Sequence, residues 1–135
     1  MKTTLTALLA ICLCLPLMGD DAAKKKFEEM KAKAEKGDAK AQYNLGGMYY
    51  KGEGVKKDDK QAFRFYLKAA LQGDPAAQAR LGTCYRLGEG VKQNADSSVR
   101  WYRKAAEQGL TRAQYNLGVT YVQGDGVEKD FKEAV

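Results

Sequence analysis

The sequence predicts an all-α protein, an α-solenoid of antiparallel helix pairs that is preceded by a signal peptide. Two observations predict the solenoid. The chain matches itself at a shift of 36 residues over three copies, as stacked repeat proteins do. Within each copy the matched residues recur three and four positions apart, which places them on one face of a helix. A third observation, an uncharged apolar run near the start, predicts export.

The signal peptide is expected at residues 1–19. Lys2 provides a positive charge, residues 3–19 carry none, and positions 5–17 form an apolar run. That run is shorter than the roughly 20 residues that cross a bilayer, so we expect cleavage after Gly19 rather than a permanent anchor. The sequence thus predicts an exported protein, periplasmic or secreted.

The repeats divide the remainder of the chain. Residues 38–73 form repeat 1, residues 74–109 form repeat 2, and residues 110–135 form a partial repeat 3. Residues 20–37 precede them, and their second part, FEEMKAKAEKG, aligns with the end of repeat 1. Because the terminal units of a stacked protein need atypical caps, we expect this segment to form an N-terminal capping helix.

The first helix of repeat 1 is expected at residues 39–51. Asp38 stands where an N-cap oxygen is needed, as Asp74 does in repeat 2, whereas in repeat 3 we expect Thr111 to cap the helix one residue later. Gly46 recurs in every copy, although glycine in mid-helix costs about 1 kcal/mol relative to alanine. Its recurrence predicts that another helix passes too close for a side chain.

The second helix of repeat 1 is expected at residues 59–72. Gly52 ends the first helix, and Asp58 then caps the second, with Asn94 in the same place in repeat 2. Gln61 follows Asp58 by three residues, which is the spacing of a capping box. Each copy is therefore an antiparallel helix pair that buries its apolar face only by stacking on its neighbours.

Composition and charge restrict the function. The chain has no histidine, which excludes Ser-His and Cys-His nucleophiles and histidine-ligated zinc, and we expect no catalytic residue, metal or cofactor. Outside the signal peptide Cys84 is the only cysteine; we expect a buried, inert thiol, with an intermolecular disulfide as the alternative. Basic residues exceed acidic ones by 23 to 17, but the two are interspersed. We therefore expect no nucleic-acid partner, and the excess charge favours an acidic partner or an anionic envelope surface.

The segments AQYNLG and WYRKAAEQG and the loop pattern YxxGxGV resemble Sel-one-like repeats, a branch of the tetratricopeptide superfamily with a longer unit. The resemblance covers residues 38–135. It implies an α-solenoid whose first helices line a concave surface, and a role as scaffold or adaptor, often at or beyond the bacterial envelope. Some relatives carry a cysteine pair in every repeat and have been proposed to bind or hydrolyse β-lactams. This chain lacks the pairs, because Cys84 aligns with Met48 and Thr120.

We expect an exported, non-catalytic scaffold that binds a protein or peptide partner on this concave face. On the first helix, positions 43, 47, 50 and 51 lie beside the packing face and differ between copies. Tyrosines there offer contact area, and Lys51 or Arg86 offers a charge to a carboxylate. For Tyr43 and Tyr115, packing against a neighbouring second helix is an equal alternative. The predicted partner-binding residues are Tyr43, Tyr50, Lys51, Thr83, Arg86, Leu87, Tyr115 and Val119.

The alternative function is that of a cell-wall-associated hydrolase or a β-lactam-binding protein. Glu53, Glu89 and Asp125 occupy the same place in three successive loops, and paired carboxylates about 5 to 9 Å apart can hydrolyse glycosidic bonds. A residue that recurs in every copy is more readily explained by a role in the loop itself, so we expect these acids to be structural.

Overall fold

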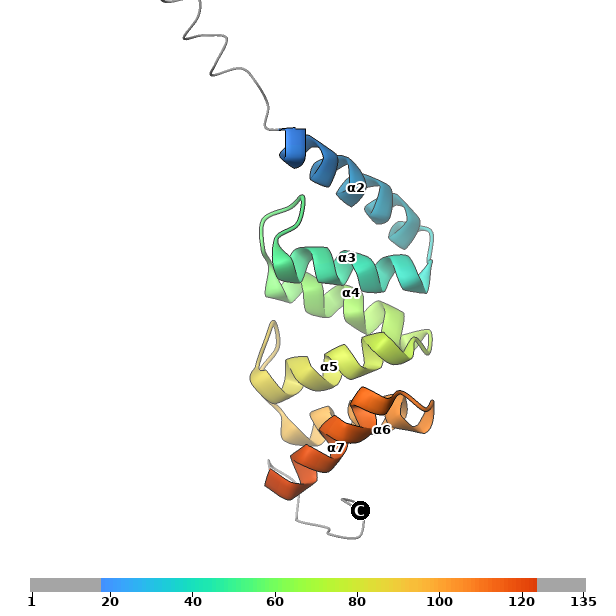
Figure 1. Ribbon diagram of the computed structural model, residues 1–135, viewed down its shortest axis with the longest axis vertical. Coiled ribbons are helices and arrows are strands. Elements are labelled where there is room, and N and C mark those ends of the chain that lie inside the picture. The colour runs from blue at the N-terminus through green and yellow to red at the C-terminus, as the bar shows by residue number, and fades with distance from the viewer. Residues whose placement is uncertain (1–17, 124–135) are drawn as a thin grey trace, which may run out of the picture.

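A computed structural model describes residues 18–123, which form a single stack of α-helices (Figure 1). Each helix contacts the helices before and after it in the chain, and the described residues include no strand. The all-α solenoid predicted from the repeat is therefore confirmed. The helices are α2 (Met18–Glu35), α3 (Ala39–Lys51), α4 (Asp59–Leu71), α5 (Pro75–Leu87), α6 (Ala95–Glu107) and α7 (Thr111–Gln123).

Some of the sequence predictions concern residues before position 18 or after position 123, outside the part of the chain that the structure describes. The expected signal peptide lies outside the described residues except for Met18 and Gly19, which open α2. The described part of repeat 3 ends at Gln123, so the expected start of a second helix in this repeat and Asp125 also lie outside the described residues. No helix within residues 18–123 is long and apolar enough to cross a membrane.

Side-chain caps begin helices α3 to α6, as the sequence predicts. An Oδ1 atom accepts from the backbone N–H three residues later at all four sites: Asp38 (2.9 Å), Asp58 (3.1 Å), Asp74 (2.8 Å) and Asn94 (3.0 Å). At the other end of the first helices, Gly52 and Gly88 adopt the left-handed conformation, with φ of 72° and 73°. The recurring caps and glycines therefore set the 36-residue unit.

Two local predictions are wrong. No capping box closes at α4, because the Asp58 N–H donates to the Tyr49 carbonyl at 2.9 Å rather than to the Gln61 side chain. Thr111 does not cap α7 either. It is the first residue of that helix, in the same register as in the other repeats, and the N–H of Ala113 donates to the Leu110 carbonyl at 3.0 Å. A backbone acceptor thus replaces the aspartate that repeat 3 lacks.

The predicted close crossing of the two helices of a repeat is confirmed. A Cβ atom placed on Gly46 would lie 2.7 Å from the ring of Tyr66, and one on Gly82 would lie 2.5 Å from the ring of Tyr102. Both tyrosines are buried, with exposures of 2% and 0%. Glycine is therefore required on the first helix because an aromatic ring of the second helix fills the space.

Successive repeats are joined by glutamines. Gln42 on α3 donates to the Ala34 carbonyl of α2 at 3.2 Å, and its Oε1 accepts from Gln72 at 2.7 Å. One repeat later, Gln78 donates to the Ala70 carbonyl at 3.3 Å and accepts from Gln108 at 2.8 Å. Because α2 receives the same contact as α4, it occupies the place of a second helix, which supports its expected role as the N-terminal cap.

Candidate partner-binding pocket

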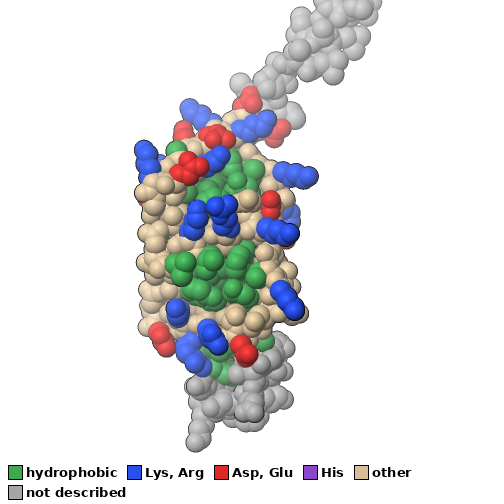
Figure 2. All heavy atoms as spheres, turned by 180° about the vertical axis from the view of Figure 1, so that it is seen from behind, with side chains coloured by type: hydrophobic (Ala, Val, Ile, Leu, Met, Phe, Trp, Pro, Cys, Tyr) green, Lys and Arg blue, Asp and Glu red, His purple; other side chains and the backbone are tan. Residues whose placement is uncertain are grey.

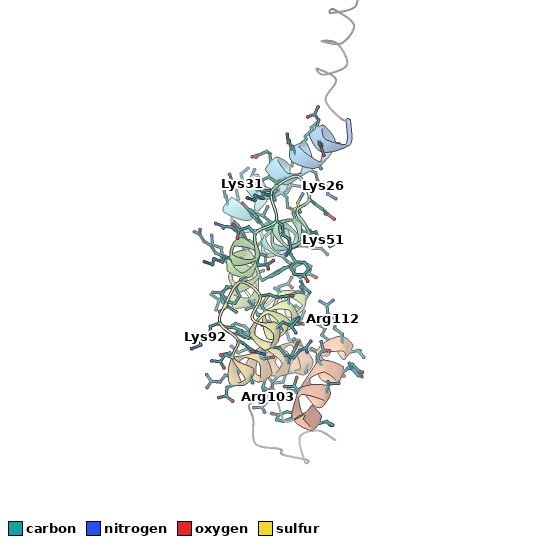
Figure 3. All side chains as sticks on the ribbon, turned by 90° about the vertical axis from the view of Figure 1, so that its left-hand side faces the viewer. Lys26, Lys31, Lys51, Lys92, Arg103 and Arg112 are labelled. Atoms are coloured by element: carbon teal, nitrogen blue, oxygen red, sulfur yellow. The ribbon has the colours of Figure 1, made fainter. Side chains whose placement is uncertain are left out.

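A pocket of about 430 Å³, which we name the basic pocket, opens beside α3, α5 and α7, the first helices of the three repeats. In Figure 3, Lys26, Lys51 and Arg112 project from one side of the molecule, whereas Lys92 lies on the other. Residues from α2, α3, α4, α5 and α7 and from one loop line it: Lys26, Met30, Tyr43, Asn44, Gly47, Met48, Tyr50, Lys51, Glu53, Tyr66, Arg80 and Arg112.

Arg80 packs against two tyrosines of this pocket. Its guanidinium carbon lies 4.5 Å from the ring centroid of Tyr50 and 5.3 Å from that of Tyr66. Burial raises the pKa of the Tyr66 hydroxyl, and the charge of Arg80 opposes this effect only in part. Tyr66 is therefore a neutral hydrogen-bonding group at physiological pH, and the guanidinium supplies the charge at this point of the pocket.

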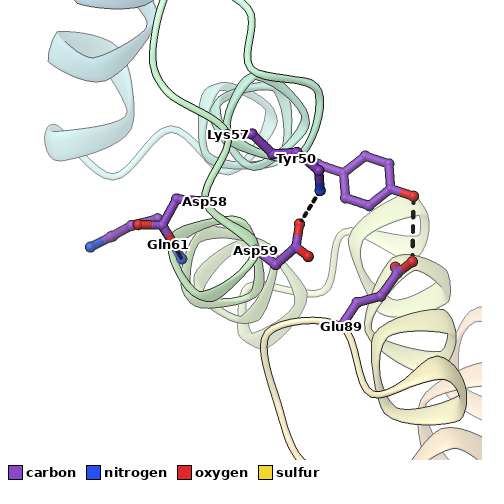
Figure 4. A network of polar contacts seen from close by, with 6 residues as sticks. All are labelled: Tyr50, Lys57, Asp58, Asp59, Gln61 and Glu89. Atoms are coloured by element: carbon purple, nitrogen blue, oxygen red, sulfur yellow. Dashed lines mark hydrogen bonds and ion pairs between the residues drawn. The ribbon is translucent and has the colours of Figure 1, made fainter.

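Tyr50 connects the pocket to the loops (Figure 4). Its hydroxyl donates to Oε1 of Glu89 at 3.5 Å, and Nζ of Lys57 lies 4.9 Å from its ring centroid. Lys57 in turn forms an ion pair of 2.7 Å with Asp59. The ring of Tyr50 thus contacts Lys57 of its own repeat and Arg80 of the next repeat, and its hydroxyl bonds to Glu89 of that next repeat.

The predicted site residues of repeat 1 come together in the basic pocket. Tyr43, Tyr50 and Lys51 all line it. Tyr43 also packs against Tyr66 of α4, with ring centroids 5.7 Å apart. The packing alternative therefore applies to Tyr43, although its partner is the second helix of its own repeat.

The predicted residues of repeats 2 and 3 lie elsewhere. Thr83 and Arg86 both contact the Tyr102 hydroxyl, with hydrogen bonds of 2.9 and 3.4 Å, and Leu87 is 52% exposed. Tyr115 is 72% exposed, so it is not packed against a described helix, and Val119 is half-buried. None of these five side chains lines the basic pocket.

Sequence reasoning missed the two arginines of the pocket. Arg80 occupies the repeat position of Asn44 and Asn116, and Arg112 occupies that of Lys40. The sequence did contain a signal for Arg80, because the other two copies have asparagine at this repeat position. Arg112 also lies one helical turn before the predicted stripe, since it precedes Tyr115 by three residues.

Two of the acids behind the hydrolase alternative, Glu53 and Glu89, have different partners in the structure, and the third, Asp125, lies outside the described residues. Glu53 is exposed and lies 3.9 Å from Nζ of Lys51, whereas Glu89 accepts from Tyr50. Within residues 18–123 no three His, Cys, Asp or Glu side chains gather as metal ligands would. Cys84 is buried, as predicted, and burial raises the pKa of its thiol to about 11. Because the thiolate is the reactive form, this cysteine is a poor nucleophile.

The opposite face of the stack carries apolar groups between basic side chains (Figure 2). On α4, Nζ of Lys68 lies 5.1 Å from the ring centroid of Phe65. On α6, Nζ of Lys104 lies 4.9 Å from the ring of Trp101. The same pair thus recurs 36 residues apart, which indicates that it belongs to the repeat rather than to a particular site.

Comparison with known proteins agrees with the repeat and the fold. The Sel1 repeat family model matches residues 39–74, 75–110 and 111–135. A protective antigen of uropathogenic Escherichia coli with an SLR fold is 47% identical, with a TM-score of 0.77 over 80% of this chain and 23% of that one. A Sel1 repeat protein from Oxalobacter formigenes is 38% identical, with a TM-score of 0.77 over 83% of this chain and 46% of that one.

Two further relatives extend the comparison. Cysteine rich protein B of Helicobacter pylori is 30% identical, with a TM-score of 0.63 over 66% of this chain and 67% of that one. A sel1-like repeat-containing protein of Acanthamoeba polyphaga mimivirus is 46% identical over 43 residues, which are 32% of this chain and 7% of the viral protein. The chain spans less than half of the E. coli and O. formigenes proteins. With three matched repeats that cover most of its length, the chain belongs to the Sel1 repeat family.

Proposed function

We propose that this protein is an exported scaffold whose basic pocket binds a segment of a partner protein. Proteins built from Sel1 repeats generally serve as scaffolds for protein–protein interaction. The observation that carries the proposal is that the pocket is lined by successive units, α2, α3, α5 and α7, rather than by one helix pair. A surface shared by several repeats suits an extended partner segment better than a small metabolite.

Export is supported by the sequence and by the relatives. Residues 1–19 have the layout of a signal peptide, and one bacterial relative of the same fold is a protective antigen. Protein recovered from outside the cytoplasm should begin at Asp20 when its N-terminus is sequenced. A protein found only in the cytoplasm with Met1 in place would contradict this part of the proposal.

Site-specific photo-crosslinking tests the location of partner binding. Lys51 and Lys92 are both exposed lysines, and they lie on opposite sides of the stack (Figure 3). A photoreactive residue at position 51 should give a discrete adduct with an envelope protein. An excess of the same protein without the photoreactive residue should suppress this adduct. The same residue at position 92 should give none. Adducts from both positions, or from position 92 alone, would refute binding at the basic pocket.

A further inference from the structure

Arg80 is a half-buried cation without an acidic partner in the described structure. The ion pairs formed within residues 18–123 are Lys51–Glu53 and Lys57–Asp59, and neither involves it. The guanidinium lies over the rings of Tyr50 and Tyr66, which hold it in place. A partly desolvated guanidinium whose position is fixed in this way is well prepared to bind a carboxylate through two parallel N–H donors.

Three other cations line the basic pocket around Arg80. Lys26 comes from α2, Lys51 from α3 and Arg112 from α7. The pocket contains one acid, Glu53, which lies 3.9 Å from Lys51 while both side chains remain largely exposed. An exposed pair at that distance is weak, so the pocket keeps a local excess of positive charge.

We propose that the basic pocket recognises an acidic segment within a partner protein, with Arg80 binding one carboxylate and Lys26, Lys51 and Arg112 binding others. This inference rests on the proposed function and specifies the chemistry of the partner. Because the cations belong to successive units of the stack, they match several side-chain carboxylates along an extended segment. A single C-terminal carboxylate would engage only one of them.

The aromatic residues of the pocket argue against a nucleic acid as the ligand. Proteins bind single-stranded nucleic acid by stacking bases on free aromatic faces. Arg80 and Lys57 lie 4.5 and 4.9 Å from the ring centroid of Tyr50. Tyr66 is 2% exposed and packs against Tyr43 and Arg80. These rings are therefore already in contact with other side chains.

Binding of a defined peptide tests the inference. The probe is a fluorescein-labelled decapeptide of alternating Glu and Gly, amidated so that it has no free C-terminal carboxylate. The comparison peptide carries Gln in place of each Glu. Fluorescence anisotropy should show binding of the Glu peptide about tenfold or more tighter than that of the Gln peptide, and the binding should weaken as salt is added.

Two pairs of variants locate the binding. Arg80→Gln should weaken Glu-peptide binding about tenfold or more, whereas Arg100→Gln, an exposed arginine of α6, should change it less than about twofold. If Arg80→Gln does not fold, a double variant at exposed pocket residues, Lys51→Gln with Arg112→Gln, replaces it. Its matched control is the double variant Lys92→Gln with Arg100→Gln, which changes one exposed lysine and one exposed arginine outside the pocket. The first double variant should lose about tenfold in affinity and the second should stay within about twofold.

Three results would overturn the inference: equal binding of the Glu and Gln peptides, equal losses in the pocket and control variants, or tighter binding of a ten-nucleotide oligothymidylate than of the Glu peptide. If the adduct at position 51 persists while the Glu peptide fails to bind, partner binding at the pocket stands and its acidic character is wrong. If that adduct is also absent, the proposed function fails as well.

Discussion

Alanine substitution of the two adjacent glycines in α3 should have opposite effects on stability. A Cβ atom at position 46 would lie 2.7 Å from Cδ1 and Cε1 of Tyr66 and 3.2 Å from the Ala62 carbonyl oxygen. Carbon atoms in favourable contact are about 3.5–4.0 Å apart. The ring of Tyr66 cannot withdraw easily, because Tyr43 and Arg80 pack against it. At position 47 the nearest atom is the Tyr66 hydroxyl at 3.8 Å, an ordinary contact.

The magnitudes follow from these distances. Overpacking a core costs about 1–3 kcal/mol, and the upper part of that range applies where the obstacle is a buried ring and a backbone carbonyl. Replacing a mid-helix glycine by alanine contributes about 1 kcal/mol in the other direction. The free energy of unfolding should therefore fall by about 1–2 kcal/mol for Gly46→Ala and rise by up to about 1 kcal/mol for Gly47→Ala.

Urea denaturation followed by far-UV circular dichroism measures both changes in the same background. Gly47→Ala serves as the matched control, because it makes the same chemical change one residue away in the same helix. The reasoning about close helix crossing would be refuted if the two variants shifted the midpoint in the same direction, or if Gly46→Ala stabilised the protein.

Three more predictions test other parts of the structure. Gln78→Ala removes the hydrogen bonds to the Ala70 carbonyl and from the Gln108 amide, each worth about 0.5–1.5 kcal/mol, and should lower the free energy of unfolding in urea by about 1–3 kcal/mol. A change below about 0.5 kcal/mol would refute a structural role. Asp74→Ala removes the N-cap of α5 and should lower the thermal midpoint through a loss of about 1 kcal/mol; an unchanged midpoint would contradict the cap. Because burial raises the pKa of Cys84 from 9.0 to about 11, the unfolded chain releases this proton first, so stability should fall as pH rises from about 9 to 11. Chemical denaturation between about pH 9 and 11 should show a smaller fall in the free energy of unfolding for Cys84→Ala than for the unsubstituted protein. If the free energy of unfolding falls equally with pH in both proteins, the raised pKa of Cys84 is wrong.

The helix limits were predictable because specific side chains mark them. The first helix was expected at residues 39–51, which the structure confirms, and the second at residues 59–72, one residue longer than α4. Asp38 and Asp58 at the starts and Gly52 at an end act within a few residues of the chain. Interactions of such short range can be read from sequence alone.

The composition of the basic pocket was less predictable, because it depends on how successive repeats are placed. Helical spacing identified Tyr43, Tyr50 and Lys51 as one stripe of α3. It did not say which part of α5 or α7 faces that stripe, because crossing angles arise from the packing of many side chains. Arg80 and Arg112 reach the pocket from those later helices, and Thr83 and Arg86 turn to Tyr102 instead.

The glutamine contacts between repeats have a consequence for how such a chain can change in length. Gln42 and Gln78 donate from the same amide to equivalent carbonyls, so the glutamine contact before repeat 1 is the same as the one before repeat 2. A unit gained between Gly73 and Asp74 by tandem duplication of the coding sequence would find a matching neighbour on each side. Lineages could therefore lengthen or shorten the array in whole units while its joints stay the same.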